Sequence, residues 1–281
     1  MSSSIAFFRC PDCFSIDLSV HDSGYVCDEC SRLLKRKDGV LDTLPAEGIR
    51  LPELYNDPNL QKWLGMWDEG HDYFYRSSGI VAWVQNAGHR VIRKWRLEDG
   101  PKQDTVLLDL GCGDGAHLDY AGEVGTYVGL DMDPAGLKQV AAANASNVKT
   151  LVPVMGDGYV LPFRDNVFDE VISIYSLEHL VYIDLCLEEV SRVLAPGGIF
   201  YVSVPNEGGL AWNMGRALSS SQHFNSDVLD YDRVIAIEHI NCIWQIEKAL
   251  KRHFKLSRMD RFPLKAPGKW CNLVSTYRCT V

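Results

Sequence analysis

The chain has 281 residues, 46% hydrophobic and 23% charged, which is enough to bury the core of one large α/β domain plus a small accessory module. The formal net charge of −9 argues against a broad nucleic-acid-binding surface. No apolar run approaches the roughly 20 residues of a membrane span, and the N-terminus lacks the basic start of a secretory signal. We therefore expect a cytoplasmic protein.

Two Cys-x-x-Cys pairs lie near the N-terminus, Cys10 with Cys13 and Cys27 with Cys30. Each pair presents two thiolates to one ion, and four thiolates complete a closed tetrahedral Zn²⁺ site. Nine cysteines, an odd number, do not suit a disulfide framework. The sequence predicts a structural zinc ribbon over residues 1–44.

Residues 45–103 are rich in aromatic side chains and are interrupted by Pro and Gly, which predicts short helices. We interpret this stretch as a helical N-terminal extension that forms a lid together with residues 206–236. From residue 104 onward, short apolar strands alternate with helices, as in a largely parallel α/β sheet. The predicted strands are 105–110, 127–130, 150–154, 170–174 and 199–204. Three helices are predicted: one that begins at about residue 116, one over 134–143 and one over 183–194.

The C-terminal part has a different pattern. Residues 206–231 are rich in Gly and Ser without a clear period, which predicts a long functional or mobile loop. A helix over 243–251 and two β-like runs, 254–259 and 274–279, complete the chain. Residues 245–281 carry nine Lys or Arg against two acidic residues, so this segment is basic in an otherwise acidic protein.

A glycine-rich turn, Asp109-Leu-Gly-Cys-Gly-Asp-Gly115, follows the first predicted strand of the α/β region. Glycines there let the backbone turn tightly and approach a ligand. The glycines alone fit a nicotinamide dinucleotide equally well. Asp109 suits the cationic amino group of methionine and would repel a pyrophosphate. Asp131 ends the second strand, where a carboxylate can bind ribose hydroxyls, and Asp157 follows the third, where it can accept from an adenine amino group.

The run from Val106 to Asn206 resembles the class I S-adenosylmethionine (SAM)-dependent methyltransferases, of the type 11/23 kind. The resemblance is carried by VLLDLGCGDGAHL, YVGLDMDP, GDGYVLPFRDNVFDEVISIYSLEHL and LEEVSRVLAPGGIFYVSVPN, in the family's order. It implies a Rossmann-like sheet of seven strands, with helices on both faces and the last two strands as an antiparallel hairpin at one edge. It also implies methyl transfer from SAM, with S-adenosylhomocysteine (SAH) as product.

The resemblance assigns cofactor-binding residues one by one. Asp109, Gly111, Gly113 and Gly115 match the glycine motif, and Asp131 matches the ribose-binding acid. Met132 is expected to pack on the adenine, and Asp157 matches the adenine-binding acid. We add their neighbours in the matching segments, which are Cys112, Gly156, Gly158 and Tyr175. A structural or dinucleotide-binding Rossmann-like domain remains the alternative.

Two histidines are candidate general bases for an acceptor hydroxyl, His179 after the fourth strand and His239 after the long loop. The order of strand, insertion and Glu-His resembles methyltransferases that modify sugars and small metabolites. We therefore expect a small-molecule or sugar-type acceptor, methylated at oxygen or nitrogen. One alternative is a ribosomal-RNA base methyltransferase gripping RNA with its zinc ribbon, although that family usually has one His among its zinc ligands. The other is a non-catalytic SAM-fold binding protein.

Overall fold

The computed structural model describes residues 5–47, 53–66, 70, 73–74, 79–100, 104–265 and 268–281. Trp67 and Tyr75, two aromatic residues of the predicted helical extension 45–103, lie outside this part of the chain. Within it, no helix has the length and apolar character that crossing a bilayer requires.

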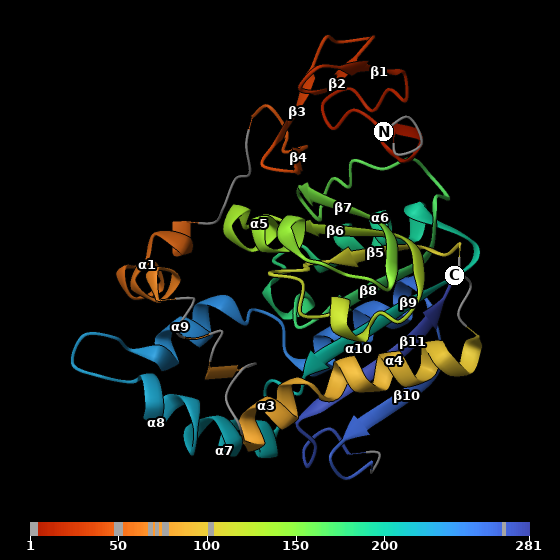
Figure 1. Ribbon diagram of the computed structural model, residues 1–281. Helices are drawn as coiled ribbons and strands as arrows, with labels where there is room; N and C mark the ends of the chain where they lie inside the picture. Colours follow the sequence, from red (N-terminus) through yellow and green to blue (C-terminus); the bar gives the residue numbers. More distant parts are fainter. Residues whose placement is uncertain are drawn as a thin grey trace.

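A twisted sheet forms the centre of the molecule (Figure 1). Seven of its strands lie in the order β7-β6-β5-β8-β9-β11-β10. The five strands from β7 to β9 run parallel, whereas β11 pairs antiparallel with β9 and β10 antiparallel with β11. The predicted seven-stranded sheet with an antiparallel edge hairpin is therefore confirmed. These strands are β5 (Val106–Leu110), β6 (Val124–Asp131), β7 (Val148–Met155), β8 (Phe168–Ile174), β9 (Leu194–Pro205), β10 (Lys255–Phe262) and β11 (Val274–Thr280).

The cysteine-bearing N-terminal segment extends this sheet instead of standing apart from it. Its strands are β1 (Leu18–His21), β2 (Gly24–Cys27), β3 (Leu33–Lys37) and β4 (Val40–Asp42). Strand β4 pairs in parallel with β7, with Leu41 opposite Val154, so the described residues form a sheet of eleven hydrogen-bonded strands. Thr43 adds two hydrogen bonds, from its backbone N–H and its hydroxyl, to the carbonyl of Met155. The ribbon thereby covers the edge of β7.

Helices cover both faces of the sheet because successive strand residues point to opposite sides. Leu108 and Val171 face a core that includes α6 (Ile183–Val193) and α10 (Ile243–His253). Leu107 and Ile172 face the other core, which includes α4 (Ala87–Asp99) and α5 (Pro134–Ala142). The remaining helices are α1 (Pro58–Gly65), α3 (Ile80–Gln85), α7 (Leu210–Ala217), α8 (Ser220–Phe224) and α9 (Tyr231–Glu238); 3-10 turns occupy Ile5–Phe7, Glu53–Asn56, Leu118–Tyr120 and Leu177–His179.

Two predicted elements are wrong. The helix expected at about residue 116 is replaced by turns and the 3-10 turn Leu118–Tyr120, since too few residues separate the glycine motif from β6 for a stable helix. The loop predicted over residues 206–231 instead contains α7, α8 and the start of α9. Its helical period is hard to detect because α7 buries no residue.

A third apolar core explains why the segment after β9 is helical. Trp63 of α1 packs edge-on against Phe224 of α8 and Tyr231 of α9, with ring centroids 5.0 Å apart in both pairs. The side chain of Arg233 donates to Asp57, the residue that caps α1. Figure 1 shows α1 beside α9, to one side of the sheet. Segments about 170 residues apart in sequence thus form one helical layer beside the carboxyl ends of the strands.

Candidate functional site

The glycine-rich turn after β5 adopts a conformation that excludes side chains. Gly111 has φ of 77° and Gly113 has φ of 53°, both in the left-handed region. A Cβ atom on Gly111 would also collide with the Ser176 side chain. The N–H groups of Gly111 and Cys112 donate to the Leu130 carbonyl, at 2.8 and 3.1 Å. The turn is thereby fixed against the end of β6.

Asp131, the last residue of β6, holds the same turn through its carboxylate. Its Oδ2 accepts from the Gly113 N–H at 2.8 Å, and its Oδ1 accepts from the Asp133 N–H at 2.9 Å. Burial raises the pKa of this carboxyl, while the backbone donors oppose the shift. Each carboxylate oxygen can accept a second hydrogen bond, so ribose hydroxyls can be held as well.

Asp109 and Asp157 complete a row of three carboxyls at the ends of the adjacent strands β5, β6 and β7. Asp109 is buried and accepts from the Tyr127 hydroxyl. Burial raises the pKa of Asp109 to about 7. Asp157 accepts at Oδ1 from the Tyr159 N–H at 2.8 Å, and burial raises its pKa too. Both carboxyls are therefore suited either to form hydrogen bonds in the protonated, neutral state or to pair with a cation.

The other predicted cofactor-binding residues surround this row. Met132 is 43% exposed, which leaves its side chain accessible to a ligand, and Cys112 is buried within the turn. Gly156 donates its N–H to the Asp131 carbonyl, which connects the ends of β6 and β7. Tyr175 has a left-handed φ of 54° directly after β8 and donates its hydroxyl to the Val84 carbonyl at 3.4 Å. Gly115 lies in the glycine-rich turn after β5, and Gly158 lies in the segment that follows β7.

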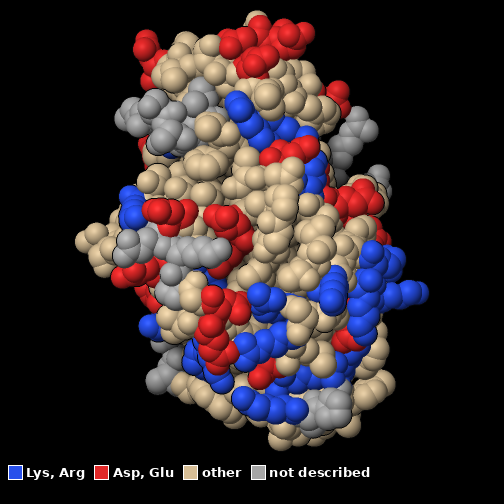
Figure 2. Space-filling view, turned by 90° about the vertical axis from the view of Figure 1, so that its right-hand side faces the viewer, with Lys and Arg blue, Asp and Glu red and all other residues tan. Residues whose placement is uncertain are grey.

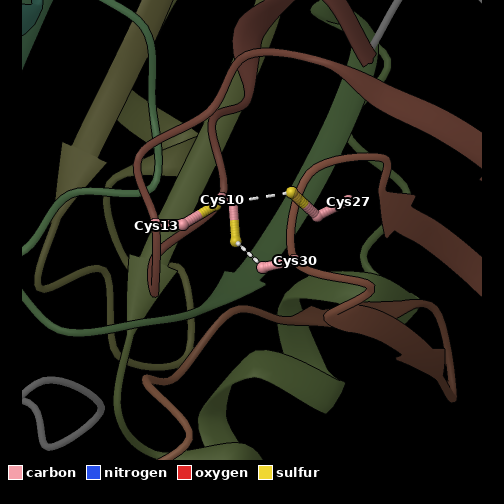
Figure 3. A group of neighbouring side chains, drawn as sticks. All are labelled: Cys10, Cys13, Cys27 and Cys30. Atoms are coloured by element: carbon pink, nitrogen blue, oxygen red, sulfur yellow. Dashed lines mark hydrogen bonds between the residues drawn. The ribbon is translucent and has the colours of Figure 1, made fainter.

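The four predicted zinc ligands converge on one point (Figure 3). The sulfurs of Cys10 and Cys30 lie 3.5 Å apart, as do those of Cys13 and Cys27, and all four sulfurs lie within 4.8 Å of one another. Zn–S bonds of about 2.3 Å in a tetrahedron place sulfurs about 3.8 Å apart. None of the four forms a disulfide. The donor set therefore fits one Zn²⁺ ion.

A second polar cluster lies at the carboxyl end of β8, beside the glycine turn. His179 closes the 3-10 turn that follows β8, and His239 caps the C-terminal end of α9. Their rings stand edge to face with centroids 4.9 Å apart. The structure thus brings together the two histidines that the sequence proposed separately.

Two carboxylates that the sequence analysis did not single out complete this cluster. Glu178 is 1% exposed and precedes His179 directly. Glu207 accepts at Oε2 from His239 Nδ1 at 2.8 Å and also from the Trp212 indole N–H at 2.5 Å. The one available sequence signal was position, since Glu178 adjoins His179 and Glu207 follows the end of β9 by two residues.

Burial and mutual contact shift the pKa of each member of this cluster. Burial lowers the pKa of His179 to about 3 and raises the pKa of Glu178 to about 7. Burial also disfavours the charged forms of His239 and Glu207. The hydrogen bond and the charge interactions around them together outweigh burial, so the pKa of His239 is raised and that of Glu207 is lowered. His179 is therefore neutral at physiological pH, whereas the hydrogen bond between His239 and Glu207 favours the charged form of each.

Comparison with known proteins relates the central part of the chain to methyltransferases. Residues 108–202 match the methyltransferase domain family. A fatty-acid O-methyltransferase from Mycolicibacterium smegmatis is 37% identical over 97 residues, 34% of this chain and 35% of that protein. A demethylmenaquinone methyltransferase from Staphylococcus aureus is 32% identical over 129 residues, 44% of this chain and 52% of that protein. The chain thus spans between a third and about half the length of these curated relatives.

Two solved structures share the fold. Magnesium protoporphyrin IX methyltransferase from Synechocystis, with bound SAH, superposes with a TM-score of 0.52 at 14% identity, covering 81% of this chain and 96% of that one. The PH0226 protein from Pyrococcus horikoshii gives 0.51 at 19% identity, covering 82% and 99%. Residues 108–202 therefore resemble the methyltransferase domain family, and the chain shares its fold with magnesium protoporphyrin IX methyltransferase. An N-terminal four-cysteine ribbon is joined to its sheet.

Proposed function

We propose that this protein transfers a methyl group from SAM to a small-molecule acceptor. The observation that carries the proposal is the row of Asp109, Asp131 and Asp157 around the glycine turn, at the carboxyl ends of three adjacent parallel strands. Open α/β sheets bind ligands at that edge. The two curated methyltransferases that match part of this chain act, by their names, on a fatty acid and on demethylmenaquinone, which supports a small-molecule acceptor.

Each carboxylate of the row has a place in donor binding. Asp131 would accept from the ribose hydroxyls, and Asp157 from the adenine amino group. Asp109 is a buried carboxyl beside the turn, and the cationic amino group of methionine would offset the burial that raises its pKa. A dinucleotide pyrophosphate would meet the same carboxylates with repulsion.

The acceptor is proposed to contact His179 and His239 at the end of β8. In methyl transfer a lone pair on the acceptor oxygen or nitrogen forms the new bond to the methyl carbon, and the proton of the acceptor group passes to a base or to solvent. The carbon–sulfur bond breaks with its electron pair staying on sulfur, and SAH leaves as a neutral thioether. The donor is already activated, so the chain chiefly positions the acceptor and excludes water. Helices α7 to α9, from residues 206–238, would cover it.

The proposed structural role of the zinc ribbon is to support the donor pocket. The strand β4 is hydrogen-bonded to β7, whose carboxyl end leads to Gly156 and Asp157. Arg9 of the ribbon donates to the Leu161 carbonyl and pairs with Glu189 at 2.9 Å. These contacts brace the segment after Asp157 from its outer side.

The basic C-terminal segment does not favour the RNA alternative. Figure 2 shows one face of the molecule, on which Lys and Arg gather in the lower half, at the level of α4, β10 and β11 in Figure 1. Several Lys and Arg residues of the segment 245–281 already have acidic partners. Arg258 pairs with Glu98, Arg278 with Asp99 and Lys269 with Glu247. Such a surface offers fewer free charges to phosphates than its composition suggests.

Isothermal titration calorimetry with SAH tests the donor proposal on the full chain. We expect one site per chain, and no binding of SAH or SAM would refute the proposal. Labelled methyl transfer from SAM to a panel of fatty acids, quinols and sugars then tests the acceptor class. Transfer to RNA alone, with RNA affinity that falls steeply as salt is added, would support the ribosomal-RNA alternative. SAH binding without transfer to any acceptor would favour a non-catalytic binding protein.

A further inference from the structure

The cluster at the end of β8 has the composition and spacing of a second metal site. Glu178, His179 and His239 each offer one ligand atom, and these three atoms all lie within 4.8 Å of one another. Three points at that spacing have a common centre no more than about 2.8 Å from each. Zinc–nitrogen and zinc–oxygen bonds are about 2.0 to 2.2 Å long, so each side chain would move inward by well under 1 Å.

The hydrogen bonds of the two histidines leave the same ring nitrogen of each available. His179 Nδ1 lies 3.1 Å from the Glu238 carbonyl oxygen, which can only accept, so Nδ1 carries the proton. His239 Nδ1 lies 2.8 Å from Glu207 Oε2 and donates to it in the same way. When the ring is neutral, as metal binding requires, the Nε2 lone pair is free for an ion. Metal-binding histidines are typically oriented by this kind of carbonyl or carboxylate partner.

Glu178 supplies the independent sign of a missing partner. Its side chain is 1% exposed, and Oε2 is buried with no hydrogen-bond partner among the described residues. A buried carboxylate oxygen without a partner is costly, because its hydration is lost and nothing replaces it. Two further carboxyls, Glu207 and Glu238, lie close enough to act on His239. A divalent cation would neutralise this concentration of acidic groups.

We propose that Glu178, His179 and His239 bind one divalent transition-metal ion, through a carboxylate oxygen and the two Nε2 atoms. Two histidines and one carboxylate select such ions and leave coordination positions open. Glu207 is a positioning residue, since it touches the ion only through His239. This site is separate from the four-cysteine ribbon, whose four thiolates close the coordination shell.

The place of the ion indicates what it does, and this step rests on the proposed methyltransferase function. Ser176, two residues before Glu178, packs against Gly111 of the donor turn, so the ion lies beside the expected methyl donor. An open coordination position there would bind an acceptor oxygen and lower the pKa of its hydroxyl. The hydroxyl proton would leave to solvent before transfer, and the oxygen would attack the methyl carbon. The acceptor class is therefore an oxygen ligand, such as a phenol or a hydroxyl beside a carbonyl.

Cobalt titration of the full-length protein, prepared with a single Zn²⁺ per chain in the four-cysteine ribbon, tests the site. We expect one Co²⁺ per chain with visible absorption bands and without the near-ultraviolet band of cobalt bound to thiolates. Glu178→Gln, His179→Ala and His239→Ala should each weaken Co²⁺ binding tenfold or more, and Glu207→Gln about 10- to 100-fold. His223→Ala, which removes an exposed histidine outside the cluster, should bind Co²⁺ as the wild type does.

The wild-type titration keeps the test decisive even if a variant folds poorly. Absence of a nitrogen- and oxygen-ligated cobalt site in the wild type would overturn the inference. Variants that still bind SAH but keep wild-type Co²⁺ affinity would overturn it too. SAH binding without cobalt binding would leave the methyltransferase proposal standing and refute the metal site. Cobalt binding without SAH binding would support the metal site and refute the methyltransferase proposal.

Discussion

Replacing Asp131 by Ala tests the central feature of the donor pocket. The carboxylate accepts from Gly113 at 2.8 Å and from Asp133 at 2.9 Å, so its loss leaves two backbone donors without their acceptor. It also removes the oxygens proposed to bind the ribose. Hydrogen bonds to a charged group contribute roughly 1.5 to 3 kcal/mol each, and water replaces part of what is lost. We expect SAH affinity to fall by about 2 kcal/mol, a factor of about 30.

Calorimetry with SAH and urea unfolding should be measured on the same variants. Asp131→Asn keeps one acceptor oxygen, so its SAH affinity should lie between those of the wild type and Asp131→Ala. Glu123→Gln is the matched control, because Glu123 is an exposed carboxylate at the opposite end of β6. An Asp131→Ala protein with SAH affinity within twofold of the wild type would show that the ribose is held elsewhere. Equal losses in Glu123→Gln would indicate a general effect of charge.

Three further predictions address the turn, the ribbon and the acid limit of stability. Gly111→Ala should weaken SAH binding tenfold or more, since the added Cβ meets Ser176 and a positive φ is imposed on Ala; Ser176→Gly should restore part of the affinity in the double variant. Elemental analysis should find zinc bound to the protein. Cys13→Ser should lower both the zinc content and the SAH affinity, because β4 of the ribbon is paired with β7 beside the proposed donor pocket. A zinc-free variant with wild-type SAH affinity would contradict this link between the ribbon and the donor pocket. Although burial raises it, hydrogen bonds from Lys251, Lys269 and Tyr277 lower the pKa of Glu247 to about 2. The stabilisation of the fold by ionised Glu247 is therefore complete above the unfolded-state pKa of about 4.5 and is lost as the pH falls towards 2. Glu247→Gln should lower the free energy of unfolding, measured in urea, by about 1 to 2 kcal/mol at pH 6 and by little at pH 2.5. A cost independent of pH would refute the reasoning.

The sequence determined what depends on local physics. The parallel strands are short apolar runs that are legible because both faces are buried, as in Val106–Leu110 and Phe168–Ile174. The glycine turn was predictable because only glycine fits its left-handed positions, and the zinc ribbon because paired cysteines have few other uses. Helix α5 was predictable from Pro134 at its first turn, which Asp133 caps through two backbone N–H groups.

Only the tertiary structure decided which distant segments meet. Helices α8 and α9 are short and could not be recognised alone, since isolated helices of that length are marginal and these two pack on Trp63. Strand β4 joined the ribbon to the main sheet through pairing with residues more than 100 positions away, which no local pattern encodes. The Glu178, His179, Glu207 and His239 cluster likewise depends on α9 returning to the end of β8. Local sequence thus specified the proposed donor site, whereas long-range packing assembled the proposed acceptor side.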